Sequence, residues 1–180
     1  MRARRYQHDV SPLDLAPPEP MPRHARPRLL AVLLLSMGLT HCALDAGRRV
    51  PPEQITVSTA DAAEAATLIS RYRTTRGLNA VISDADLNRA AAEQVRAVAE
   101  RGKLSHGDFS GRMAAYAIAG SAAENLSAGS DTVSGAVVRW QRSPRHNDNL
   151  LMKEARRVGL AKASTPGQGY GTYWALVLAQ

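Results

Sequence analysis

Apolar side chains recur at helical spacing from Asp61 onward. Their positions fall at i, i+3, i+4 and i+7, and they are Ala65, Leu68, Ile69 and Tyr72. This spacing is typical of a helix that buries one face against a core. Gly77 lies where a glycine would end that helix.

A second stretch of helical spacing runs from Ser83 to Gly102. Its apolar positions are Leu87, Ala91, Val95 and Val98. The Ser83 hydroxyl could accept a hydrogen bond from the free amides of the first turn, and Asp86, three residues later, completes a capping-box pattern. We therefore predict a second amphipathic helix that begins at Ser83 and is ended by Gly102.

Two later stretches carry the same signal. Residues 111–119 predict a short helical turn from a weaker pattern. A further helix is expected to begin near Ser130 or Asp131, and Pro144 prevents its continuation because proline has no amide hydrogen and its ring clashes with the preceding turn. The buried positions of this helix are expected to be Val133, Ala136, Val137 and Trp140.

The pattern changes from helical to strand-like near the carboxyl end. Residues 157–163 and 172–179 are strand-like, and the Pro-Gly-Gln-Gly sequence at 166–169 is a hairpin-type connection. The second segment is apolar on both faces, which predicts a central strand covered on both sides. Helices followed by antiparallel strands imply an α+β layered domain over residues 61–180.

The amino-terminal part has the pattern of a targeting segment. Residues 29–40 form an apolar run that follows Arg23, Arg26 and Arg28. The run is too short to span a bilayer as a helix, but a basic segment followed by such a run is typical of a signal peptide. A buried core helix is the alternative, which the flanking charge makes less favourable. We predict that residues 1–42 direct export, with Met21 as an alternative start of a more compact signal.

Cys42, the sole cysteine of the chain, directly follows Leu39-Thr40-His41. This arrangement resembles a bacterial lipobox, whose cysteine is lipidated and becomes the mature amino terminus, although His41 stands where a small residue is usual. Lipidation would anchor the protein to a membrane; without it, Cys42 lies near an ordinary cleavage site. Residues 43–60, which contain Gly47, Pro51 and Pro52, are predicted to form a linker.

The distribution of charge argues against a nucleic-acid partner. The formal net charge is +7, and residues 1–42 contribute six arginines against three acidic residues. The basic residues of the remaining chain are dispersed, with no dense run and no interleaved aromatic residues for base stacking. A mildly basic surface is the simpler interpretation.

Candidate chemistry after Cys42 rests on two histidines, His106 and His146, and on Glu124 between them. Two imidazoles and one carboxylate could make a three-ligand zinc site with an open position. The alternative is three scattered polar residues that hold loops through hydrogen bonds. The spacing by itself favours the alternative, because gaps of 18 and 22 residues match no compact metal motif.

Four landmarks in order resemble bacterial SCP-like domains of the CAP superfamily over some 120 residues. An Arg-Gly pair is followed by Ser-His, and then comes a Glu-Asn-Leu segment. A helix tryptophan leads to Ser-Pro-x-His and Asn-x-Leu-type residues, and a Val-Gly strand precedes a Tyr-Trp strand. The residues are Arg101-Gly102, Ser105-His106, Glu124-Asn125-Leu126, Trp140, Ser143-Pro144, His146, Asn149-Leu150-Leu151, Val158-Gly159 and Tyr173-Trp174.

The resemblance implies a three-layer α-β-α sandwich with a cleft lined by His106, Glu124 and His146. Asn125, Ser143 and Arg145 are further cleft candidates on the same motifs. Ser143 occupies the position at which eukaryotic relatives carry a second acidic residue. Two other departures are Ala123 and Arg145 at positions where glycine is usual, and Arg157 stands where an acidic residue is frequent.

These departures make the expected cleft more positive. Arginine side chains that face inward would oppose a bound cation and favour an anionic group such as a phosphate or a carboxylate. We therefore expect no required cofactor, and only weak binding of zinc or another divalent cation at His106, Glu124 and His146.

Three classes of function remain open at this point. The leading one is an exported, non-catalytic binding module in the cell envelope or secreted, whose unknown small ligand is a lipid or an anion. The second is a peptidase-like hydrolase, with or without metal, in which Ser143 and His146 suggest a serine triad, although no Gly-x-Ser-x-Gly elbow is present. The third is a scaffold whose polar cleft residues make only structural hydrogen bonds.

Overall fold

The computed structural model describes residues 49–180. Its helices are α1 (Ala62–Thr74), α2 (Ala85–Arg101), α3 (Phe109–Ala115), α4 (Val133–Arg142) and α5 (Pro144–Leu150), with a short 3-10 turn, η1 (Pro52–Gln54). Its strands are β1 (Thr56–Ser58), β2 (Ile82–Ser83), β3 (Ala122–Ala128), β4 (Arg157–Ser164) and β5 (Thr172–Ala179). Within this range no helix has the length and apolar character needed to cross a membrane.

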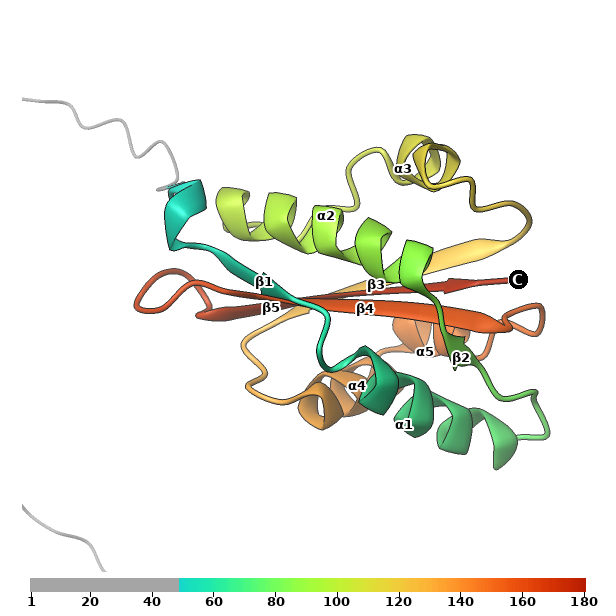
Figure 1. Cartoon of the computed structure of the whole chain (residues 1–180). Helices are drawn as coiled ribbons and strands as arrows, with labels where there is room; N and C mark the ends of the chain where they lie inside the picture. Colours follow the sequence, from blue (N-terminus) through green and yellow to red (C-terminus); the bar gives the residue numbers. More distant parts are fainter. Residues whose placement is uncertain (1–48) are drawn as a thin grey trace, which may run out of the picture. The chain divides into compact units, whose positions relative to one another are not determined.

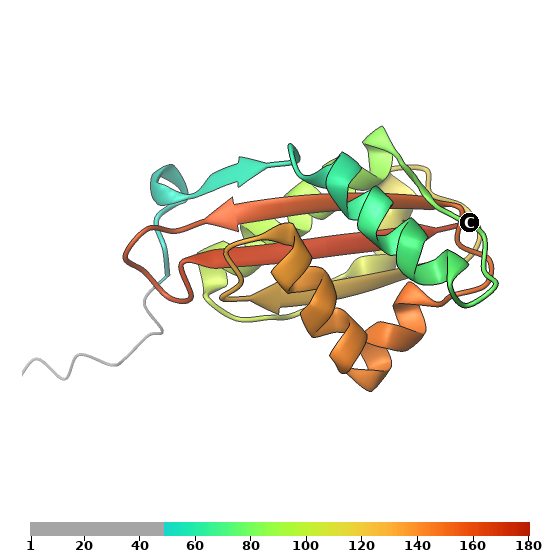
Figure 2. The ribbon, with the colours of Figure 1, turned by 90° about the horizontal axis from the view of Figure 1, so that it is seen from below.

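The strands form one mixed sheet in the order β1-β4-β5-β3. The pairs β1–β4, β4–β5 and β5–β3 are antiparallel, and β2 joins β4 in parallel. Strand β5 is therefore central, as its apolar sequence predicts. Strand β3 lies at the edge, where β5 is its one strand partner among the described residues (Figure 2).

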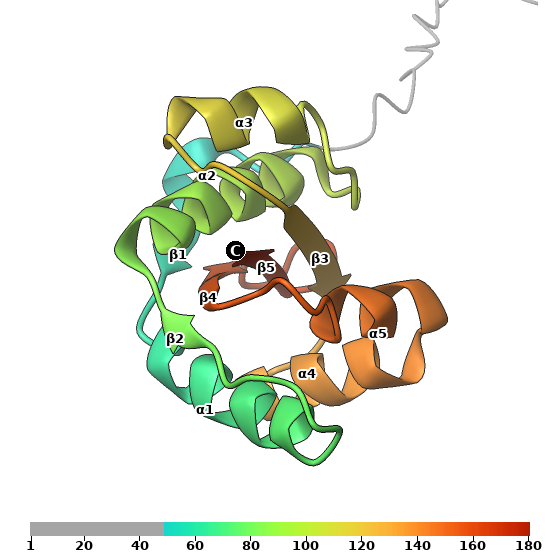
Figure 3. The ribbon, with the colours of Figure 1, turned by 90° about the vertical axis from the view of Figure 1, so that its right-hand side faces the viewer.

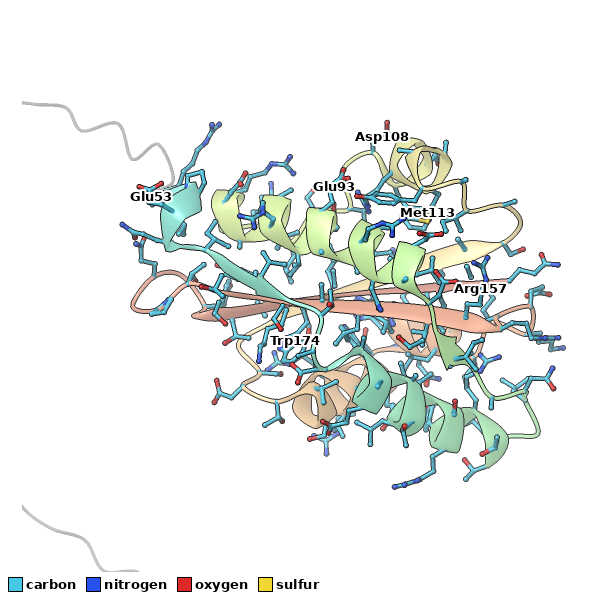
Figure 4. All side chains as sticks on the ribbon, viewed as in Figure 1. Glu53, Glu93, Asp108, Met113, Arg157 and Trp174 are labelled. Carbon is cyan, nitrogen blue, oxygen red and sulfur yellow. The ribbon has the colours of Figure 1, made fainter. Side chains whose placement is uncertain are left out.

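Helices cover both faces of this sheet. Helices α2 and α3 lie on one face, and α1, α4 and α5 lie on the other (Figures 1 and 3). The alternation of β5 sends Tyr173 and Ala175 to the α2 face and Trp174 and Leu176 to the opposite face. Figure 4 shows the same division, with Met113 and Trp174 on opposite sides of the sheet.

Helix α2 and the sheet approach each other closely at a strand glycine. Under α2 the sheet presents small residues, and a Cβ atom built on Gly159 would lie 2.1 Å from the backbone carbon of Leu87. Only glycine permits this close approach of helix and strand. On the opposite face, the fully buried indoles of Trp140 and Trp174 are part of the core.

The α+β class, the three layers and the strands at the carboxyl end are confirmed. The cap of the second predicted helix is wrong by one residue: Asp84 accepts hydrogen bonds from the amides of Asp86 and Leu87, each at 2.9 Å. Ser83 instead belongs to β2, where it pairs with Val158. The expected capping box from Ser83 to Asp86 does not form because the strand continues to Ser83.

Among the elements that were not predicted, β3 and α5 matter most for the candidate site. Strand β3 has the sequence Ala-Ala-Glu-Asn-Leu-Ser-Ala, which is poor in the β-branched residues that signal a strand. Helix α5 begins with Pro144 in its first turn, so the proline that separates it from α4 also starts a new helix. Both elements carry candidate site residues.

The predicted linker is wrong for its carboxyl half. Val50 and Ile55 are buried in the core beneath α2, and β1 pairs residues 56–58 with β4. Residues 50–58 therefore belong to the folded domain. The targeting segment 1–42, Cys42 and residues 43–48 lie outside the described residues.

Candidate functional site

Glu124 is the buried centre of the candidate site. It projects from β3 toward the α2 layer and is 5% exposed. One carboxylate oxygen lies 2.8 Å from Nδ1 of His106, which follows α2 in the chain. The other accepts a hydrogen bond from the guanidinium of Arg112 in α3 at 2.5 Å. Each carboxylate oxygen therefore already has a cationic or imidazole partner.

Local structure holds the His106 loop in place. Gly102 ends α2 in the left-handed conformation, with φ 61°, and turns the chain toward β3. The buried Gln94 side chain then donates a hydrogen bond to the carbonyl of Ser105. The His106 side chain remains 56% exposed, so it forms the solvent-facing side of the pair.

Opposing influences act on the Glu124 carboxyl. Burial raises its pKa above the ordinary value for glutamate, since the charged form loses its hydration. The hydrogen bond from His106 and the positive charge of Arg112 act in the opposite direction but do not cancel the effect of burial.

His146 lies on the other side of β3, in α5. Asparagine side chains fix this helix to the strand: Asn125 donates to the His146 carbonyl at 2.9 Å, and Asn149 donates to the Glu124 carbonyl at 3.2 Å. The His146 ring makes no hydrogen bond with the described residues. Its pKa is lowered, first by burial and then by the charge of His106.

A cavity of about 210 Å³ opens beside His146 and crosses the edge of β3. It is lined by Leu104, Leu126, Ser127, Ala128, Arg139, Trp140, His146 and Tyr170. The predicted trio is thus divided: His106 and Glu124 are hydrogen-bonded to each other, whereas His146 lines the adjacent cavity. Figure 3 shows β3 between the α2–α3 layer and α5, which explains this division.

The arginines expected at the cleft lie elsewhere. Arg145 is exposed and does not line the cavity. Arg157 pairs with Asp84 at 3.1 Å and donates to the Gln180 carbonyl, at the end of the sheet where α2 begins (Figure 4). The positive charge at the site comes instead from Arg112 and Arg139, which were not among the predicted site residues.

Helical periodicity could have indicated one of these two arginines. Arg139 precedes the buried Trp140 on a helix whose inner face was predicted correctly, so it lies beside that face. Arg112 gave no such signal because its contact with Glu124 depends on the position of an unpredicted strand. Ser143 caps neither helix through its side chain and makes no hydrogen bond with either histidine.

The donor set at this site fits a metal poorly. The residues from 49 to 180 contain no group of three or more His, Cys, Asp or Glu side chains placed to hold a metal ion. Arg112 competes directly for the carboxylate that a cation would need. Weak zinc binding at His106, Glu124 and His146 stays a prediction.

Solved structures with this fold include bacterial surface and extracellular proteins. An outer surface protein from Borrelia burgdorferi aligns with a TM-score of 0.61 at 19% identity, covering 68% of this chain and 95% of that one. An extracellular protein with an SCP domain from Bacillus anthracis aligns with a TM-score of 0.57 at 18% identity, over 65% of this chain and 39% of the other. A cysteine-rich secretory protein from Staphylococcus aureus gives 0.53 at 16%, over 71% and 39%.

No curated protein matches the sequence. The model of the cysteine-rich secretory protein family matches residues 66–178, which is most of the described domain and includes β3, α5 and all three predicted site residues. The order of elements, the three layers and this match agree, and the chain belongs to the cysteine-rich secretory protein (CAP) family.

Proposed function

We propose that this protein is an exported, non-catalytic binding domain whose cavity beside His146 takes a small ligand with an acidic group. The observation that carries the proposal is the combination of Arg139 and His146 with apolar walls in one open cavity. A guanidinium in a partly apolar site favours a carboxylate or phosphate. The apolar walls favour a ligand that also carries a hydrocarbon part.

Binding is favoured over catalysis by the contacts of Glu124. Its two oxygens are engaged by Arg112 and His106, so a carboxylate is not available as a base at the cavity. Ser143, the candidate nucleophile, has no hydrogen bond to a histidine, and nucleophilic catalysis requires such a base within reach. Peptide or ester hydrolysis that is lost in both His106→Ala and Glu124→Ala would instead support the hydrolase alternative.

A titration with 4-methylpentanoate tests the acidic-ligand proposal. We expect saturable binding that Arg139→Gln weakens about tenfold or more, because a charge-assisted hydrogen bond contributes about 1.5–3 kcal/mol. Arg145→Gln is the matched control, since it removes an exposed arginine that does not line the cavity. Equal effects of the two changes, or no binding to the wild type, would contradict the proposal.

A lipid ligand would need a different surface, because 210 Å³ is below the roughly 300–1,000 Å³ of typical small-molecule pockets. An apolar groove of about 300 Å³ lies between α1 and α4, with Leu68, Val137 and Val138 among its lining residues. Palmitate binding that Val138→Glu abolishes, with 4-methylpentanoate binding unchanged, would assign a lipid to this groove.

Export is supported by two independent features. The basic and apolar segment before Cys42 is typical of a signal peptide. The proteins that share the fold are described as an outer surface protein, an extracellular protein and a secretory protein. In this proposal Cys42 carries the lipid that holds the domain at the cell envelope.

A further inference from the structure

The outer edge of β3 is only partly occupied. Its Glu124 carbonyl accepts a hydrogen bond from Asn149, and its Leu126 carbonyl accepts one from Nε1 of Trp140 at 3.2 Å. Both carbonyls therefore point away from β5. Side chains of α4 and α5 satisfy these two groups in place of a further strand.

Within residues 126–128 of this edge, two amides and one carbonyl remain unpaired. In an antiparallel ladder the amide and carbonyl of one residue point to the same side, and the side alternates along the strand. The Gly129 amide donates to the Thr172 carbonyl at 2.8 Å, which places odd-numbered residues on the β5 side. The amides of Leu126 and Ala128 and the carbonyl of Ala128 thus face outward, and no described residue pairs with them.

The cavity beside His146 lies on this unpaired stretch. Leu126, Ser127 and Ala128 all line it. The Ser127 hydroxyl, in a residue 3% exposed, is buried without a hydrogen-bond partner among the described residues. Buried polar groups almost always have a hydrogen-bond partner. An unpaired hydroxyl beside an unpaired strand edge therefore indicates that a polar ligand supplies the missing hydrogen bonds.

We propose that the cavity binds the carboxyl-terminal end of an extended peptide, which pairs with residues 126–128 of β3 as a short additional strand. The terminal carboxylate contacts Arg139 and His146, and the last side chain lies against Leu104 and Tyr170. This inference rests on the proposed function and names the class of its ligand. Addition of a strand to an exposed sheet edge combines main-chain hydrogen bonds with side-chain pockets.

Charge and size both favour this occupant. Arg139 lies on α4, and no carboxylate of the described residues lies within 4 Å of its guanidinium group. An incoming carboxylate thus meets uncompensated positive charge. A cavity of about 210 Å³ can enclose the end of a chain, and its opening to solvent lets the preceding residues continue outside.

Peptide probes separate strand pairing from simple anion binding. We expect acetyl-Ala-Ala-Leu with a free carboxylate to bind the full-length protein at least tenfold more tightly than 4-methylpentanoate, which offers the same side chain and charge without the backbone. The peptide amide should lose this binding. Two further peptides carry a methyl group on the last amide nitrogen or on the preceding amide nitrogen. At least one of them should lose the tight binding, because methylation removes the donor to the Ala128 carbonyl.

Hydrogen exchange reports the pairing directly. Exchange of the Leu126 and Ala128 amides should slow when the peptide binds and stay unchanged with 4-methylpentanoate. Ala128→Pro removes one outward amide, and proline is tolerated at a strand edge, so this change should weaken the peptide while sparing 4-methylpentanoate. If Ala128→Pro fails to fold, the methylated peptides decide the question.

The possible failures are distinguishable. Equal affinity for peptide and 4-methylpentanoate, with no effect of methylation, would overturn the strand pairing and leave the proposed function standing. Absence of binding by every probe would overturn both. If the Arg139→Gln variant and the Arg145→Gln control bind the peptide equally tightly, the assignment of the terminal carboxylate to Arg139 is overturned.

Discussion

Glu124 shows how one side chain serves the fold while it shapes the site. Its carboxylate joins the loop after α2 to α3 through His106 and Arg112, and both members of the Glu124–Arg112 pair are buried. A buried pair of this kind contributes little compared with apolar residues of the same size, yet the loss of one partner leaves a charge without compensation. Glu124 is therefore expected to matter for stability at least as much as for ligand binding.

Glu124→Ala should lower the free energy of unfolding by about 3–5 kcal/mol, because it leaves the Arg112 guanidinium buried and unpaired. Urea titration measures this change. Arg89→Ala, which breaks the exposed pair with Asp86, is the control and should cost less than about 1 kcal/mol. Similar costs for the two variants would mean that water reaches Arg112.

His146 should titrate below the ordinary imidazole pKa of about 6.5, since burial and the charge of His106 both disfavour its protonated form. The unfolded chain then takes up this proton first as the pH falls. The free energy of unfolding therefore decreases as the pH falls from the ordinary imidazole pKa to the lower pKa of His146 in the folded protein. His146→Gln should remove that decrease.

Proton NMR of the ring checks the direction. His106→Gln should raise the pKa of His146 only in part, because burial is the larger cause. A titration at or above the ordinary value in the wild type would show that the ring is better hydrated than its position implies.

At the scale of elements, single side chains connect segments that lie far apart in sequence. The buried Arg73 of α1 donates hydrogen bonds to four carbonyls, in the loop before β2 and in the connection from α5 to β4. These acceptors are the carbonyls of Asn79, Leu150, Met152 and Ala155. No acidic residue is needed, because the five guanidinium hydrogens match a cluster of backbone acceptors.

Arg73→Met should cost about 3 kcal/mol or more, since each buried carbonyl left without a donor costs roughly 1–3 kcal/mol. Arg71→Met, two residues earlier on the exposed side of α1, should change stability by no more than about 0.5 kcal/mol. Denaturant titration of both variants makes the comparison. A loss below 1 kcal/mol for Arg73→Met would indicate that water replaces the guanidinium.

Trp140 attaches α4 to β3, because its fully buried ring packs beneath the sheet and its indole donates to the Leu126 carbonyl. Trp140→Ala should cost about 3–5 kcal/mol, as large aromatic truncations do. Val138→Ala on the exposed face of the same helix should stay within about 0.5 kcal/mol. If both variants unfold at the same urea concentration, α4 is not anchored by this ring.

At the scale of the whole molecule, the domain begins earlier than the helical pattern suggests. Val50 lies in the core and its amide donates to the Glu100 carbonyl at the end of α2. The folded part therefore starts within about ten residues of Cys42. A lipid on Cys42 would hold the domain close to the membrane surface.

Lipidation can be tested in cells that express the full chain. A radioactive fatty acid should label the wild type and fail to label Cys42→Ser, because the thiol is the acylation site. Fractionation of the same cells should place the wild type with the envelope. Equal labelling of the two proteins, or labelling of neither, would contradict the lipoprotein prediction and leave simple secretion open.

The sequence by itself determined the elements with strong local signals. Helical spacing located α1, α2 and α4, and the two-sided apolar pattern identified β5 as central, because burial on one or both faces is recorded in the order of residues. The family landmarks also predicted that His106, Glu124 and His146 line one cleft. These signals need no knowledge of long-range contacts.

Only the tertiary structure decided what those residues contact. The residues of β3 have no local strand pattern, and the strand is recognised only by its pairing with β5. Asp84 rather than Ser83 caps α2, because β2 extends to Ser83. The pairing of Arg112 with Glu124, and the separation of His146 from that pair, follow from the side of β3 on which each element packs. Side chains alternate between the two faces of a strand, so the position of the strand in the sheet decides which elements they contact. A local pattern of residues does not predict these contacts.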